Sequence, residues 1–155
     1  MHHILNLANS RQIEVNDQVI DKSAVEAYTS GQCLAFAIEL GKLLGSLHLT
    51  IVELADEQMR PRVVMAHAYA TQGEFSYDIS KEFRTDELTS KDVLNDLYEC
   101  HPSDDTAEVY AFSMSPQEAY KKYWDMLPRQ NWILARRFAK LRFEQLESDK
   151  NSQEK

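Results

Sequence analysis

The sequence has few of the residues that form linkers and disulfide frameworks. It contains four glycines, four prolines and two cysteines among 155 residues. Neither Cys33 nor Cys100 belongs to a Cys-x-x-Cys pair, so we expect two reduced thiols and no metal site. There is also no Gly-rich phosphate-binding loop, and we expect no cofactor. Because repeats and linker-like segments are missing as well, we expect a single domain over residues 1–147 and a polar tail over 148–155.

Long apolar runs and an excess of positive charge are also missing. No apolar stretch approaches the roughly 20 residues that a membrane-spanning helix needs, and no basic segment followed by a long apolar one opens the chain. We therefore expect a cytoplasmic protein that does not bind membranes. The net charge of -8 argues against nucleic acid as a partner, since nucleic acid attracts basic surfaces. Such a charge would suit a basic protein partner.

Positive charge is concentrated near the C-terminus. Arg136, Arg137, Lys140 and Arg142 fall within one predicted helix. This pattern is typical of the solvated face of a helix. The alternative is a docking face for an acidic partner.

The order of the predicted elements indicates an α+β fold with a helical C-terminus. Ser23 and Glu26 form a predicted capping box for the first helix. Residues 34–44 are apolar on nearly every side, which is typical of a helix buried in the middle of a domain. We expect this helix to pack on a mainly antiparallel sheet. The predicted strands are 11–20, 47–54, 62–70, 75–80 and 107–114, and the predicted helices are 23–30, 33–44, 89–98, 116–127 and 131–147.

Cys33 lies in the first turn of this apolar helix, directly after Gly31 and Gln32. The positive end of a helix dipole favours thiolate over thiol, which makes a cysteine nucleophilic. Backbone N–H groups at a helix start could also stabilise an oxyanion, with Gln32 as an additional side-chain donor. Cysteine is equally common as a buried core residue. The position of Cys33 is therefore consistent with chemistry or with packing.

A predicted hairpin brings His67 and Asp78 together. If its loop is Gln72-Gly73, His67 stands directly opposite Asp78 on the neighbouring antiparallel strand. Opposed residues share a face with Cβ atoms about 4.5–5.5 Å apart, within reach of a hydrogen bond. Without a catalytic role, the two are a half-buried histidine and an aspartate at a strand end. We expect Cys33 to join them only if the cysteine helix covers the His67 face of the sheet.

The order of these residues resembles the papain-like fold. A glycine-polar-cysteine step opens a central helix, a histidine strand follows, and an acidic residue lies on the next strand. The chain is most similar to compact bacterial versions, the NlpC-like peptidases and the papain-fold toxin or deamidase domains, over about a third of its length. The resemblance implies that Cys33 is the nucleophile, His67 the base and Asp78 the orienting residue, with Gly31 and Gln32 as matching motif positions.

Two functions fit the sequence. The first is a small cysteine-dependent amide hydrolase that acts on a peptide bond or a glutamine side chain by acyl transfer through Cys33. The second is a non-catalytic acidic protein-binding module, an inhibitor or adaptor of the kind found in phages and mobile elements. Both predict a protein or peptide as the partner. The oligomeric state is left open.

Overall fold

The fold is α+β, as the sequence predicts, in a computed structural model that describes residues 1–6, 11–29, 32–55, 63–90, 93 and 108–153. The strands are β1 (His2–Asn6), β2 (Gln12–Asn16), β3 (His48–Ala55), β4 (Val63–Gln72), β5 (Phe75–Tyr77), β6 (Glu82–Arg84) and β7 (Glu108–Met114). The helices are α1 (Lys22–Thr29), α2 (Cys33–Leu44), α4 (Pro116–Tyr123) and α5 (Arg129–Gln153), with short 3-10 turns η2 (Thr85–Glu87) and η3 (Trp124–Met126).

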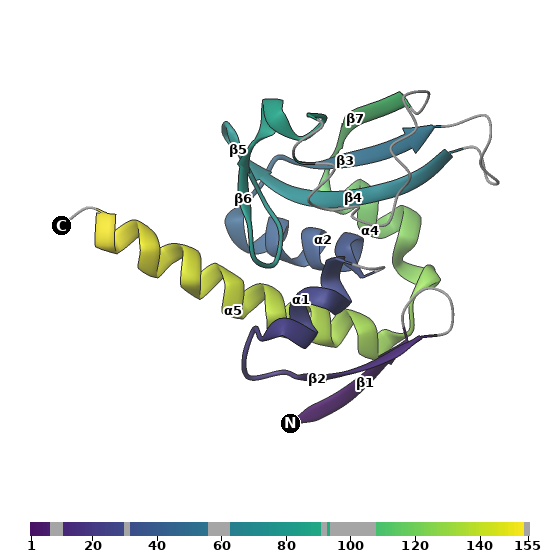
Figure 1. Cartoon of the computed structure of the whole chain (residues 1–155), viewed down its shortest axis with the longest axis vertical. Coiled ribbons are helices and arrows are strands. Elements are labelled where there is room, and N and C mark those ends of the chain that lie inside the picture. Colours follow the sequence, from purple (N-terminus) through teal and green to yellow (C-terminus); the bar gives the residue numbers. More distant parts are fainter. Residues whose placement is uncertain (7–10, 30–31, 56–62, 91–92, 94–107, 154–155) are drawn as a thin grey trace.

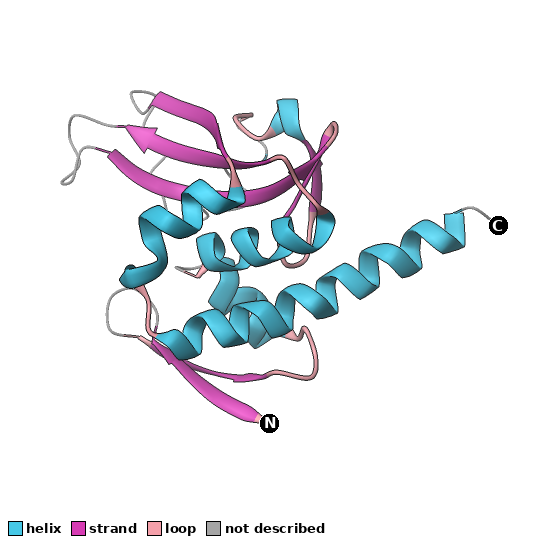
Figure 2. Ribbon diagram, turned by 180° about the vertical axis from the view of Figure 1, so that it is seen from behind, coloured by secondary structure: helices cyan, strands magenta, loops and turns pink. Residues whose placement is uncertain are grey.

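The strands form two separate sheets. The larger has the order β6-β5-β4-β3-β7 with antiparallel neighbours, and β1 and β2 form a two-stranded hairpin. Helix α2 lies between the large sheet and α5, and the small hairpin lies against the start of α5 (Figure 1). Seen from behind, the C-terminal end of α5 extends beyond the rest of the molecule (Figure 2). The result is a layered structure with α2 at its centre.

Helix α2 is buried because it has neighbours on both sides. Every residue from Ala35 to Gly41 is buried, which explains why the sequence is apolar around the whole helix. The helix ends at Gly45, whose φ of 67° is left-handed and whose amide bonds back to the last turn. Glycine adopts this conformation without steric cost and commonly ends helices. The predicted bounds of this helix and its place on an antiparallel sheet are confirmed.

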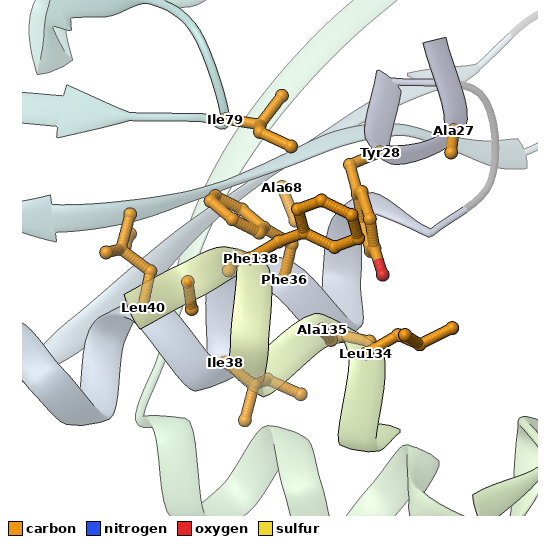
Figure 3. Close-up of a cluster of buried hydrophobic side chains, with 14 of the residues drawn as sticks. Ala27, Tyr28, Phe36, Ile38, Leu40, Ala68, Ile79, Leu134, Ala135 and Phe138 are labelled. Carbon is orange, nitrogen blue, oxygen red and sulfur yellow. The ribbon is translucent and has the colours of Figure 1, made fainter. Parts of the chain in front are cut away.

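One core joins the elements that carry the candidate residues. The ring of Tyr28 in α1 contacts Phe36 in α2 and Phe138 in α5, with centroids 5.7 and 5.2 Å apart. Figure 3 shows Ala68 of β4 and Ile79, just after β5, beside these rings. Packing of this core therefore fixes α2, β4 and the segment around Ile79 relative to one another.

Several local predictions differ from the structure. The first helix begins at Lys22, and its cap is Asp21, whose side chain accepts a hydrogen bond from the Ala24 amide at 3.0 Å. The Ser23–Glu26 capping box is therefore wrong, because Ser23 already lies inside the helix. Strands β1 and β6 were not predicted, since each is too short for a clear alternating pattern.

Helix α5 continues to Gln153, so it includes most of the segment predicted as a polar tail. The predicted helix over 89–98 falls largely outside the described residues, as does Cys100. Within the described residues, no helix has the length and apolar character needed to cross a membrane.

The contact between α2 and β3 leaves no space for a side chain at position 41. A Cβ atom added to Gly41 would lie 2.8 Å from Cδ2 of the buried Leu49 and 3.4 Å from Cγ of Pro116. We expect Gly41→Val to lower the free energy of unfolding by roughly 1–3 kcal/mol through overpacking. The matched control is Leu43→Val, which also introduces valine into α2 but at a side chain that is 41% exposed. Urea denaturation of both variants checks this, and equal losses would contradict it.

Candidate active site

Cys33 is the first residue of α2 and is half-buried. The residue before it, Gln32, is buried and has partners on two other elements. Its Nε2 donates to the carbonyl oxygen of Asn6 at 3.3 Å, and its Oε1 accepts from Nδ2 of Asn131 at 3.1 Å. These contacts tie the start of α2 to β1 and α5. Gln32 therefore helps to fix the helix start. Its role as an additional oxyanion donor stays a prediction, and Gly31 lies outside the described residues.

His67 and Asp78 form the predicted hydrogen bond. Nε2 of His67, in β4, lies 3.2 Å from Oδ2 of Asp78, the residue that follows β5. The two side chains are only 1% and 2% exposed. A hydrogen bond between imidazole and carboxylate is stronger in such a water-poor environment than in solvent. The pairing of these residues is confirmed.

The register that led to this pairing is wrong by two residues. The loop is Gly73-Glu74, with φ of 62° at Gly73, and the strand pairs run from Gln72 with Phe75 to Ala70 with Tyr77. This register, extended by one residue, sets Asp78 opposite Tyr69 instead of His67. A shift of two residues keeps every side chain on its predicted face, because side chains alternate with a period of two. Asp78 therefore reaches His67 diagonally, beyond the end of the strand.

The face covered by α2 also differs from the prediction. Ala68 and Ala70 of β4 pack with Phe36 of α2 in the main core. His67 lies on the opposite face, where its ring meets the edge of Tyr69 with centroids 4.6 Å apart, and Tyr69 packs against Val52. Coverage of the His67 face by the cysteine helix, which was the condition for Cys33 to join His67 and Asp78, is therefore not met.

Cys33 reaches His67 beside the edge of β4. Only Ala70 to Gln72 of β4 pair with β5, so the described β4–β5 pairing ends before Ala68. The amide of Ala68 interacts with the sulfur of Cys33, and the thiol also interacts with the imidazole of His67. The three predicted residues therefore do come together, but by a route that differs from the expected one.

A tight turn fixes the carboxylate of Asp78. Its Oδ1 accepts hydrogen bonds from the amides of Ser80 at 2.9 Å and Lys81 at 2.6 Å, and its own amide donates to the carbonyl of Lys81 at 3.1 Å. Aspartate commonly stabilises turns in this way. Ile79, inside the turn, is fully buried in the core. Oδ2 is left to bind His67 in a fixed direction.

The site favours charged forms despite its burial. Burial raises the pKa of the Cys33 thiol, but interaction with His67 and with the amides of Ala68 and Cys33 brings that pKa below its ordinary value. Burial lowers the pKa of His67, but the Cys33 thiolate and the hydrogen bond to Asp78 raise it to about 9. Burial raises the pKa of Asp78, and the hydrogen bond from His67 more than offsets this. The arrangement favours the thiolate, the imidazolium and the carboxylate over their neutral forms.

One atom of the site is left without a strict hydrogen-bond partner among the described residues. Nδ1 of His67 is buried, and no described group meets hydrogen-bond geometry with it. Because Nε2 is bound to Asp78, Nδ1 is the nitrogen available for proton exchange with the thiol. Other buried side-chain atoms of the described residues share this property, so the position of Nδ1 beside the thiol is what distinguishes it.

The four residues of the predicted basic cluster differ in their exposure and contacts. Arg136 pairs with Glu39 at 3.4 Å, and Arg137 forms an ion pair with Asp17. Arg142 is buried and binds backbone carbonyls, whereas Lys140 is exposed. Arg136, Arg137 and Lys140 are exposed, as expected for the solvated face of a helix, whereas the buried Arg142 departs from that prediction, and a docking role of this face stays a prediction.

Arg142 is the residue of this site that sequence reasoning missed. It binds the turn that carries Asp78, with its Nε 3.0 Å from the carbonyl oxygen of Asp78. A signal was present in the sequence, since Arg142 follows Phe138 by four residues and so belongs to the buried stripe of α5.

The comparisons with known proteins give no relative. No family model matches the sequence, and no curated protein or solved structure matches the chain. Among the described residues, no group of three or more His, Cys, Asp or Glu side chains is placed to hold a metal ion. Interpretation of the site therefore rests on its own geometry and electrostatics.

The lowered pKa of Cys33 is directly measurable. In a Cys100→Ser background, only Cys33 can react with iodoacetamide. We expect the rate of alkylation against pH to show a midpoint below the value of about 8.5 that is typical of a free thiol. His67→Gln should move this midpoint upward because the thiolate loses its cationic partner. A wild-type midpoint at or above the ordinary value, or no change in His67→Gln, would show that the thiol is not activated.

Proposed function

We propose that the protein is a small cysteine hydrolase that cleaves an amide bond by acyl transfer through Cys33. The observation that carries this proposal is the buried His67–Asp78 hydrogen bond of 3.2 Å, whose imidazole also interacts with the thiol of the half-buried Cys33. The same three residue types in the same chain order support the resemblance to papain-like hydrolases. In this proposal Cys33 is the nucleophile, His67 the acid and base, and Asp78 the orienting residue.

The chemistry follows from the charges of the three groups. The thiolate of Cys33 attacks the substrate carbonyl carbon, and the carbonyl oxygen becomes an oxyanion. Nδ1 of the His67 imidazolium donates its proton to the leaving amine as the C–N bond breaks, which leaves a thioester on Cys33. The neutral imidazole then takes a proton from water, whose oxygen attacks the thioester. Release of the carboxylic acid restores the thiolate and the imidazolium.

Two backbone features support this sequence of steps. The amide of Cys33 lies at the start of α2, where backbone N–H groups have no intrahelical acceptor. Such an amide is suited to stabilise the oxyanion of the tetrahedral intermediate. The Asp78 carboxylate fixes the ring through Nε2, so that Nδ1 stays directed at the reacting atoms.

The proposed substrate is a peptide bond or a glutamine side chain of a protein or peptide, handled in the cytoplasm. Release of an amine distinguishes the first reaction, and release of ammonia distinguishes the second. Neither reaction needs a cofactor, because the nucleophile and the proton-transfer group both come from the chain.

The first test uses an activated ester, which needs no knowledge of the natural substrate. We expect p-nitrophenyl acetate to acetylate Cys33, with the mass of one acetyl group found on its peptide. His67→Gln should slow this by about 10²–10⁴-fold, the usual loss when a general acid–base is removed. Cys33→Ala should abolish it, and Cys100→Ser is the control that keeps full reactivity. Acetylation that persists in Cys33→Ala would contradict the proposal, and a peptide panel then separates amine from ammonia release.

A second candidate function is a non-catalytic protein-binding module. It is favoured by the net charge of -8 and by exposed apolar side chains at α4 and η3, among them Trp124 at 55% exposure. Binding of a protein partner that is unchanged in Cys33→Ala, together with an unreactive thiol, would favour this candidate over the hydrolase.

A further inference from the structure

Arg142 is buried to an extent that is unusual for an arginine. It lies in α5 and is only 7% exposed. Moving a guanidinium out of water is costly unless its N–H groups find acceptors of good geometry. The contacts that Arg142 makes should therefore indicate why the residue is there.

The acceptors of Arg142 lie at both ends of the Asp78–Lys81 turn. Nε donates to the carbonyl oxygen of Asp78 at 3.0 Å, and Nη2 donates to the carbonyl oxygen of Lys81 at 3.2 Å. Nη1 adds a longer contact of 3.4 Å to Oε1 of Gln145 on the same helix. Two N–H donors of the planar guanidinium thus bind two backbone carbonyl groups of one turn.

These contacts act on the residue that orients His67. The carboxylate of Asp78 is bound on one side to the amides of its own turn and on the other to His67. A change in the backbone of this turn would therefore move Oδ2 relative to Nε2 of His67. Arg142 also faces the charges of Asp78, Glu82 and Asp149 and the phenol of Tyr77, so its charge is balanced locally.

We propose that Arg142 is a positioning residue of the Cys33 site, which holds the Asp78–Lys81 turn so that Asp78 can orient His67. This inference rests on the proposed cysteine hydrolase. Arg142 touches neither the thiol nor the substrate in this account. It acts through Asp78, and its loss should resemble a partial loss of Asp78.

The test follows the thiol, not the substrate, because alkylation of Cys33 reports the thiolate directly. In the Cys100→Ser background, Arg142→Met removes both turn contacts. We expect the midpoint of its alkylation rate against pH to rise by roughly 0.5–1 unit, which makes alkylation about threefold to tenfold slower than in the parent protein at pH values well below both midpoints. Lys140→Met is the matched control on the exposed face of α5 and should leave the rate unchanged.

A double-mutant cycle separates positioning from general destabilisation. Asp78→Asn alone should slow alkylation, and Arg142→Met added to it should change the rate by less than about twofold, because both act through one route. Full additivity of the two effects would overturn the proposal. So would a folded Arg142→Met variant, by near-ultraviolet circular dichroism, that keeps the parent rate.

If Arg142→Met does not fold, Arg142→Lys tests the positioning role of Arg142. Lysine keeps the charge but is a point donor that cannot hold both carbonyls in the fork geometry. We expect it to react more slowly than the parent protein, and a parent-like rate would overturn the proposal. A failure of this proposal can also be distinguished from a failure of the proposed function. If the protein shows no hydrolase activity but Arg142→Met slows alkylation, the positioning role of Arg142 is supported and the hydrolase is not. If the protein is an active hydrolase but Arg142→Met reacts like the parent protein, the positioning role is contradicted and the hydrolase is not.

Discussion

The buried hydrogen bond between His67 and Asp78 is the interaction on which the account of this protein depends. Two ionisable groups with almost no exposure to water stabilise each other's charge there, and the amides of Ser80 and Lys81 also stabilise the Asp78 carboxylate. The thiol of Cys33 adds a third charge that the imidazolium balances. Removal of His67 would leave two buried negative charges without the cation that compensates them. The three residues therefore form one electrostatic unit, and its geometry is under strong structural constraint.

The fold supplies that geometry from elements that are distant in the sequence. Cys33 comes from the start of α2, His67 from β4, Asp78 from the turn after β5, and Arg142 from α5. A single core connects these elements, and Ile79 places the Asp78 turn directly in it (Figure 3). The site also lies where β4 extends past its pairing with β5, which opens a strand edge beside the helix start. Stability of the core and geometry of the site are therefore coupled.

Part of this arrangement was predictable from the sequence. The apolar run of α2 and its glycine stop identified the central helix. The period of two in β-strands put His67 and Asp78 on one face, even though the loop position was wrong by one residue and the strand pairing by two. The face on which α2 packs was not predictable, because both faces of β4 carry apolar residues and only tertiary packing decides between them. Arg142 escaped notice because clustered basic residues usually face solvent, and backbone acceptors in a distant turn leave no local sequence pattern.

The most direct test of the central claim is an NMR pH titration of the His67 imidazole in the native protein. The account predicts that the ring stays protonated through neutral pH and titrates at about 9, since the Cys33 thiolate and Asp78 both stabilise its charged form. Cys33→Ser should lower this pKa because the thiolate is lost. A His67 ring that titrates at or below the ordinary histidine value of about 6.5 would contradict a thiolate–imidazolium pair, and with it the proposed nucleophile.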